Sequence, residues 1–213
     1  MNSDNSKMLL SEVFRPVAVN ELALPEAVKA TMTKWIAKRS IPNLLFYGPP
    51  GTGKTSAARI IANELGCELH SINGSHNSGD KTMVKNIQNI CSSFSLFQMP
   101  KVIHIDEADG LSNTVQNALR CIVEESSANV RFIMTANDVS RLSSAMRSRF
   151  TSILFDPTKQ HRAEILTNLV NTYEAKFASL GLDYDPVRVN EIVRMFFPDL
   201  RTVANRFQLE FGW

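Results

Sequence analysis

The segment GPPGTGKT, residues 48–55, has the glycines and lysine typical of a phosphate-binding loop. Its glycines let the backbone turn amide groups inward around phosphate oxygens, and the N-terminus of a following helix adds partial positive charge. Lys54 would reach the β- and γ-phosphates, and the hydroxyl of Thr55 would hold Mg²⁺. We therefore predict that a nucleotide is surrounded by Gly48, Pro49, Pro50, Gly51, Thr52, Gly53, Lys54, Thr55 and Ser56.

A second chemical signal is the segment KVIHIDEAD, residues 101–109, which is apolar up to Ile105 and then turns acidic. This pattern predicts a buried strand with Asp106 and Glu107 at its C-terminal end, where open α/β sheets bind ligands. We assign Asp106 as a Mg²⁺ carboxylate, directly or through water, and Glu107 as the base that orients and polarises the attacking water. His104 lies inside the strand, and we interpret it as a hydrogen-bonded core residue.

An alternation of helices and strands must position these residues. Apolar residues recur at helical spacing after Pro25, over 54–66 and around 84–91, and short apolar runs predict strands at 43–48, 67–73, 101–106, 130–136 and 151–155. Strands buried on both faces and joined by helices predict a parallel sheet in a three-layer α/β domain. Only helical patterns follow Asp156-Pro157. We therefore divide the chain into an α/β nucleotide-binding domain, residues 1–156, and a small all-α domain, residues 157–213.

The composition of the 213 residues argues against a strongly basic nucleic-acid binder, a disulfide or zinc framework, and a secreted or membrane protein. Lysine and arginine exceed aspartate and glutamate by two, so binding to nucleic acid would need a local basic patch. Cys67, Cys91 and Cys121 are too far apart for a CxxC pair, and we expect buried, reduced thiols. The sequence shows neither a secretion signal nor a membrane span, so we expect a cytoplasmic protein without a membrane partner.

Several motifs together resemble the AAA+ ATPases of the clamp-loader group, namely GPPGTGKT, IDEAD, TAN (135–137), SRF (148–150) and FPDLRTVANRFQ (197–208). The stretch PNLLFYGPPGTGKTS is close to replication factor C small subunits, and FFPDLRTVANRF resembles more particularly the clamp-loader ATPase subunit of tailed phages. The resemblance covers nearly the whole chain. It implies a P-loop AAA+ domain with a five-stranded parallel sheet and a helical lid. It also implies Mg²⁺-dependent ATP hydrolysis that loads a sliding clamp onto primer-template DNA in replication.

The same resemblance assigns residues around the nucleotide. FRP at 14–16 resembles the element beside the adenine pocket, which implies that Arg15 and Pro16 contact the nucleotide. Asn137 matches sensor 1, whose amide contacts the γ-phosphate or the lytic water, and Arg201 matches sensor 2 of the lid. Arg149 matches the finger that projects into the site of a neighbouring subunit, with Phe150 replacing the family's usual cysteine.

Two residues match positions that couple the site to DNA. Asn73, in SINGSH, matches the residue that restrains the catalytic glutamate until DNA is bound, although Gly74 and His76 depart from the family's pattern. Gln116 matches a glutamine that links the DNA-facing end of a central helix, about 112–125, to the ATP site. On that helix we place Gln116, Arg120 and Glu124 on one polar stripe. An ordinary polar face with an Arg120–Glu124 salt bridge is the alternative.

The remaining contacts are those with DNA and the clamp. Candidates for contact with the DNA backbone, without base readout, are Lys81, Lys85, Asn113 and Thr114. The family touches its clamp through the helix after the second strand, here around Ile90 to Phe97, where the phenylalanines of CSSFSLF are either clamp anchors or core residues.

The sequence leaves alternatives open for how the chain assembles and for what it does. Clamp-loader subunits normally continue into a helical collar that holds the ring together, whereas this chain stops at Trp213. We expect a truncated chain, a naturally short one that relies on a partner for the collar, or one that assembles into a homo- or hetero-oligomer only on DNA or ATP. Another AAA+ DNA remodeller or helicase loader stays possible, as does an assembly subunit with negligible hydrolysis. Binding to a clamp distinguishes a clamp loader from a DNA remodeller or helicase loader. The complete set of Lys54, Asp106, Glu107 and Arg149 favours an enzyme over an assembly subunit with negligible hydrolysis.

Overall fold

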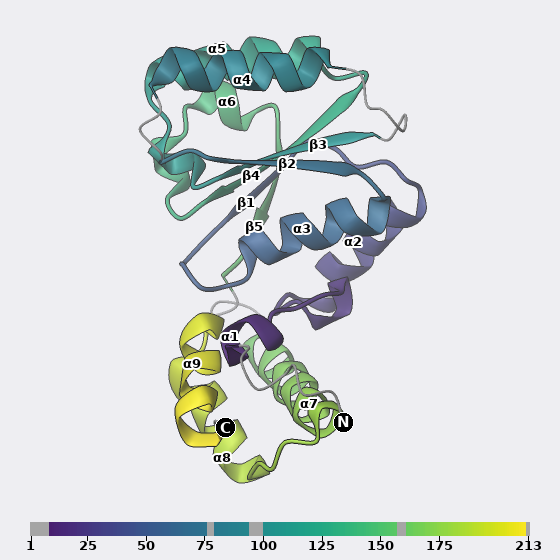
Figure 1. The fold of residues 1–213 in the computed structure, drawn as a ribbon, viewed down its shortest axis with the longest axis vertical. Coiled ribbons are helices and arrows are strands. Elements are labelled where there is room, and N and C mark those ends of the chain that lie inside the picture. Colours follow the sequence, from purple (N-terminus) through teal and green to yellow (C-terminus); the bar gives the residue numbers. More distant parts are fainter. Residues whose placement is uncertain (1–8, 76–78, 94–99, 157–160, 212–213) are drawn as a thin grey trace.

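The computed structural model describes residues 9–75, 79–93, 100–156 and 161–211, which form an α/β unit and a helical unit (Figure 1). Within these ranges, no helix combines the length and apolar character needed to cross a bilayer.

Five parallel strands form the sheet of the α/β unit, in the order β2-β3-β4-β1-β5. The register pairs Asn73 with Asp106 and Tyr47 with Ala136, so these strands bring their carboxyl ends to the same edge. The three-layer α/β fold with a five-stranded parallel sheet is thereby confirmed. The strands are β1 (Leu44–Tyr47), β2 (Glu68–Asn73), β3 (Lys101–Asp106), β4 (Val130–Ala136) and β5 (Thr151–Leu154).

Helices cover both faces of this sheet (Figure 1). One face carries α2 (Glu26–Ala37) and α3 (Lys54–Leu65), and the other carries α4 (Asp80–Ser92), α5 (Asn113–Glu125) and the short α6 (Ser144–Arg147). Because strand side chains alternate between faces, Ile103 and Ile105 join the core under α4 and α5, whereas Val102 joins the core under α3. Short 3-10 turns lie at η2 (Val19–Glu21), η3 (Ala108–Gly110) and η4 (Val139–Arg141).

The helical unit has its own core. It is built by α7 (Arg162–Leu180), α8 (Pro186–Phe196) and α9 (Leu200–Phe211), and by α1 (Leu10–Val13) from the other end of the chain. The ring of Phe14 packs 4.7 Å from that of Phe177 and 5.6 Å from that of Phe207, measured between centroids. The amide of Leu10 donates to Gln208 Oε1 at 2.8 Å.

The packing of α1 refines the predicted division of the chain. The sequence predicts an α/β domain over residues 1–156, but α1 belongs to the core of the helical unit because Leu10 and Phe14 fill the space beside α9. The boundary at residue 156 stays a prediction.

The cysteines also differ from expectation. All three are free thiols, but Cys121 is exposed and Cys67 and Cys91 are only partly buried. Cys121 reaches solvent because its neighbours on α5, Leu119 and Ile122, take the core positions.

Candidate nucleotide-binding site

The loop between β1 and α3 has the backbone that the sequence predicts. Gly48 has φ +142°, and an added Cβ would lie 2.4 Å from the carbonyl oxygen of Phe155. Gly53, directly before α3, has φ +93°, a conformation that favours glycine. Among the residues that the structure describes, no side chain caps the first turn of α3, which leaves its amides to bind an anion.

Lys54 is buried in the centre of this loop, with 8% of its surface exposed. Its ammonium donates to the carbonyl oxygens of Gly48 at 2.8 Å and Pro49 at 2.7 Å, and to Asn137 Oδ1 at 2.9 Å. Burial lowers the pKa of Lys54 from 10.5 to about 8, although Asp109 and Asp106 oppose the shift. The structure therefore places the predicted sensor 1 residue beside the predicted phosphate-binding lysine.

Asp106 lies at the end of β3, between two threonine hydroxyls. Thr55 Oγ1 lies 3.1 Å and 3.2 Å from its two carboxylate oxygens, and Thr135 at the end of β4 donates to Oδ1. The hydroxyl of Thr135 also accepts from the amide of Glu107 at 3.2 Å. The TAN motif therefore contributes Thr135 as a positioning residue in addition to the predicted Asn137, and no sequence pattern indicates this role.

This arrangement fits Mg²⁺. The ion prefers oxygen ligands and is usually held by one or two carboxylates together with water and substrate phosphates. Thr55 and Asp106 supply a hydroxyl and a carboxylate on the pocket wall.

Glu107 has an unusual backbone and a restrained side chain. Its φ of +54° lies in the left-handed region, which costs a non-glycine residue about 1–3 kcal/mol and is concentrated at functional sites. Its Oε2 accepts a hydrogen bond from Ser75 Oγ, and the Ser75 amide donates to Asn73 Oδ1 at 2.8 Å. Asn73 is thus linked to Glu107 through Ser75, a residue that the sequence analysis did not single out.

Asp109 joins the acidic turn to the end of β4. Its carboxylate accepts from the amides of Asn137 at 3.2 Å and Asp138 at 3.3 Å. This last aspartate of the IDEAD motif therefore helps to hold Asn137 beside Lys54.

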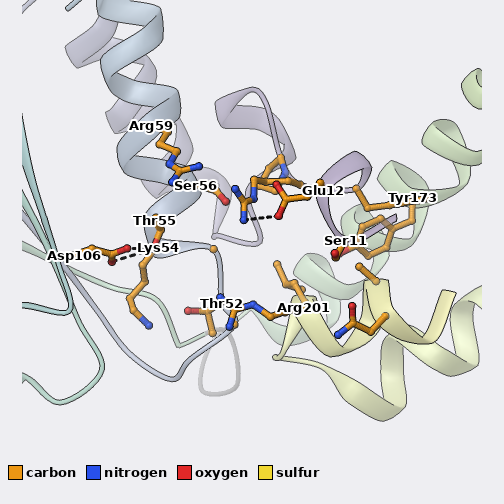
Figure 2. Close-up of a pocket in the computed structure, with 18 residues that line it drawn as sticks. Ser11, Glu12, Thr52, Lys54, Thr55, Ser56, Arg59, Asp106, Tyr173 and Arg201 are labelled. Carbon is orange, nitrogen blue, oxygen red and sulfur yellow. Dashed lines mark hydrogen bonds and ion pairs between the residues drawn. The ribbon is translucent and has the colours of Figure 1, made fainter. Parts of the chain in front are cut away.

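A pocket of about 510 Å³ lies between the loop and the helical unit (Figure 2). Lys54, Thr55 and Asp106 line the end of the pocket beside the phosphate loop, and Leu200 of the helical unit donates its amide to the carbonyl of Gly51 at 3.0 Å. In Figure 2, the Arg201 side chain extends from α9 toward Thr52. The wall includes the predicted Gly51, Thr52, Gly53, Ser56, Arg15, Pro16 and Arg201, and the unpredicted Ser11, Glu12, Phe14, Arg59, Tyr173, Leu200, Ala204 and Asn205.

Of the residues predicted to surround the nucleotide or to control its hydrolysis, those outside the wall of this pocket are Gly48, Pro49, Pro50, Asn73, Glu107, Gln116, Asn137 and Arg149. The predicted polar stripe is wrong for Gln116, which is 2% exposed because its amide is used inside the chain. Gln116 Nε2 donates to the carbonyls of Leu111 and Arg141, each at 3.1 Å, and its Oε1 accepts from the amide of Ser143 at 2.9 Å. The alternative Arg120–Glu124 salt bridge is also wrong, because Glu124 pairs with Arg149.

The candidate DNA contacts are brought together at one end of the α4–α5 layer. Ser112 Oγ, which caps α5, donates to Asp80 Oδ2 at the start of α4 at 2.7 Å. The candidates Lys81, Lys85, Asn113 and Thr114 are all exposed near this junction, as are Asp80, Thr82 and Ser112. Of the suggested clamp segment, Ile90 packs against the core, while Phe94 to Phe97 lie outside the described residues, as does His76.

His104 is buried as expected, with 1% of its surface exposed. Neither ring nitrogen has a hydrogen-bond partner among the residues that the structure describes, so the expected hydrogen bond is not found. Its Nε2 lies 3.9 Å from Asp106 Oδ1, and burial lowers the pKa of the imidazole.

Comparison with known proteins identifies the family. The model of the ATPase family associated with various cellular activities (AAA) matches residues 44–158, more than half of the chain. This chain belongs to the AAA ATPase family. The AAA match spans the phosphate loop, the acidic turn, Asn137 and Arg149.

Relatives of this AAA ATPase include subunits of replication factor C. Replication factor C subunit 3 of Schizosaccharomyces pombe is 31% identical over 203 residues, which cover 92% of this chain and 58% of the relative. Replication factor C small subunit 1 of Pyrobaculum islandicum is 33% identical over 205 residues, covering 93% and 60%. The chain thus spans less than two thirds of the length of these relatives.

A solved structure with a similar fold is Thermotoga maritima RuvB, a Holliday junction branch migration motor. The TM-score is 0.70 at 21% identity, and the alignment covers 92% of this chain and 64% of that one.

Proposed function

We propose that this AAA ATPase is the ATPase module of a sliding-clamp loader, which hydrolyses ATP with Mg²⁺ at a site shared between adjacent subunits. ATP binding is coupled to gripping the clamp and primer-template DNA, and hydrolysis releases both. The observation that carries the proposal is the meeting of Lys54, Asp106, Glu107 and Asn137 at one sheet edge, in a chain similar to replication factor C. On the strength of FFPDLRTVANRF, we place it with the cytoplasmic clamp loaders of tailed phages.

In this proposal the chemistry begins with an exchange of partners by Lys54. Its ammonium leaves the carbonyls of Gly48 and Pro49 for the phosphate oxygens of ATP, a stronger, charge-assisted contact. Thr55 and Asp106 would hold Mg²⁺, which would neutralise charge on the phosphates when bound. Glu107 orients and polarises the attacking water, and Asn137 lies beside Lys54, where its amide can meet the γ-phosphate.

Two arginines complete the proposed site from different chains. Arg201 lines the pocket of its own chain, where it would bring the positive charge of the lid to the phosphates. Arg149 belongs to the SRF motif and is held against α5 by Glu124, which supports a role at the site of the adjacent subunit. A finger of this kind stabilises charge in the transition state and raises the rate about a thousandfold or more.

Coupling to DNA has a physical route in this chain. The DNA contact candidates lie at the start of α4 and α5, and the chain from β2 to α4 passes through Ser75, which holds Glu107. A shift of this segment on DNA binding would release Glu107 for catalysis. Asn73 and Gln116 serve as the switch residues, Asn73 through Ser75 and Gln116 through its bonds to residues 141 and 143.

The test measures ATP turnover per subunit over a range of protein concentrations, with and without primer-template DNA and a clamp. A shared, DNA-coupled site predicts specific activity that rises with concentration and rises further with DNA. Subunits carrying Arg149→Ala, mixed with subunits carrying Glu107→Gln, should recover activity because each supplies what the other lacks. Flat, DNA-insensitive turnover would contradict the proposal, and DNA stimulation without clamp binding would favour another AAA+ DNA remodeller or helicase loader.

A further inference from the structure

The proposed finger arginine is held by a carboxylate of its own chain. Arg149 Nη2 donates to Glu124 Oε1 in the last turn of α5, and Nη1 donates to the carbonyl oxygen of Ala145. The backbone is fixed as well, because the amide of Arg149 donates to Met146 O at 3.2 Å and Phe150 is buried in the core. We call Glu124 and the Ala145 carbonyl the finger seat.

The helix that supplies Glu124 is attached to the finger segment at a second point. Gln116, two turns earlier on α5, binds the carbonyl of Arg141 and the amide of Ser143. Ser143 in turn caps α6, since its hydroxyl accepts from the amide of Met146 at 3.2 Å. The segment from 141 to 149 is thus tied to α5 at both ends.

Among the described residues, Glu124 pairs with Arg149 and not with its neighbour on the helix. Arg120 lies four residues before Glu124, within reach on the helix surface, although the order with the acidic residue first is the more favourable one. Over the described part of the chain, however, the ion pair of Glu124 is with Arg149. The Arg149 side chain is 24% exposed, against 58% for Glu124, so the guanidinium is the more enclosed partner.

We propose that Glu124 is a positioning residue that holds Arg149 in the orientation needed at the nucleotide site of the adjacent subunit. A guanidinium ordered in advance loses less conformational entropy when it meets the phosphates. Small misplacements of such groups lower rates by up to about a hundredfold. Because this role rests on the proposed action of Arg149 in trans, its test must separate the two.

The test uses subunits of the full chain carrying Glu124→Ala, with Glu125→Ala as the matched control. Glu125 is the adjacent exposed carboxylate on α5, so its removal makes the same change in charge. We expect Glu124→Ala to lower kcat about tenfold with the KM for ATP unchanged. Glu124→Gln should lower kcat less, because glutamine keeps an acceptor oxygen. Glu125→Ala should match the unsubstituted chain.

Mixing experiments then assign the side of the site on which Glu124 acts. Glu124→Ala mixed with Glu107→Gln should recover as much activity as Arg149→Ala mixed with Glu107→Gln, because the Glu107→Gln subunit lends an intact finger. Glu124→Ala mixed with Arg149→Ala should stay low, since every finger is then impaired. If Glu124→Ala instead recovers activity with Arg149→Ala and stays low with Glu107→Gln, Glu124 acts at the nucleotide site of its own chain. That result overturns this inference and leaves the trans role of Arg149 intact. Failure of the Arg149→Ala and Glu107→Gln pair would overturn the trans role of Arg149, and this inference with it.

A measurement without turnover tests the finger seat itself. In the full chain labelled with ¹⁵N-arginine, slow rotation of a seated guanidinium should give separate Nη signals for Arg149. Glu124→Ala should merge them, whereas Glu125→Ala should leave them separate. Merged signals in the unsubstituted chain would overturn the seat even if hydrolysis and complementation follow the proposed function.

Discussion

The protonation of Lys54 gives a quantitative test of the nucleotide site. Burial lowers its pKa to about 8. Without nucleotide, Lys54 is therefore charged in about nine tenths of the molecules at pH 7 and in about one tenth at pH 9. Phosphate oxygens favour the charged form, so bound ATP raises the pKa of Lys54 again. ATP affinity should therefore fall about tenfold, or about 1.4 kcal/mol, between pH 7 and pH 9.

Calorimetry in buffers of different ionisation enthalpy measures the protons taken up on ATP binding. We expect uptake by Lys54 of about 0.1 proton at pH 7 and about 0.9 at pH 9. Lys54→Arg is the control, since its guanidinium stays charged over this range and leaves only the protons of ATP and other groups. Equal uptake by the two chains at pH 9 would refute the reasoning.

The same shift affects stability in the absence of nucleotide. A lowered pKa for a lysine means that the unfolded chain binds more protons than the folded chain. The free energy of unfolding should therefore rise with pH between about 8 and 10.5, the folded and ordinary values for Lys54.

Three further substitutions test other contacts. Ser75→Ala should raise turnover without DNA several-fold and leave the DNA-stimulated rate unchanged, because it removes the hydrogen bond that restrains Glu107; an unchanged ratio of the two rates would contradict this role. Asp109→Ala should lower turnover and shift the pH dependence of ATP binding to lower pH, since it frees the amide of Asn137 and removes a carboxylate that raises the pKa of Lys54; kinetics and titration identical to those of the unsubstituted chain would exclude both effects. Phe207→Ala should destabilise the fold by about 3–5 kcal/mol in denaturant unfolding, because this fully buried ring packs against four other aromatic rings; a loss below about 1 kcal/mol would show that the cluster is not a core.

Local sequence patterns predict the sheet and the ends of its strands well. Apolar runs followed by glycine or acidic residues mark β1 and β3, so the pairing of Thr55 with Asp106 follows from the parallel arrangement. The four residues of α1 are too few to show a period, and the place of this helix beside α9 depends on packing between the two ends of the chain.

The sequence patterns do not predict contacts between loops. Ser75 meets Glu107 only because β2 lies next to β3 in a register that pairs Asn73 with Asp106. Periodicity placed Gln116 and Glu124 on one polar stripe, but hydrogen bonds to the 141–143 segment keep Gln116 buried and an ion pair turns Glu124 to Arg149.

The place of α1 in the helical core sets an order of events during synthesis. The bond between Leu10 and Gln208 joins residues 198 positions apart. At about 5–20 residues per second, the ribosome makes α9 roughly 10–40 seconds after α1. Leu10 and Phe14 therefore cannot pack against α9 until that time has passed. The α/β unit can fold on the ribosome during this interval. Because α1 and α9 build one end of the pocket, a nascent chain gains its complete ATP site only when α9 has emerged.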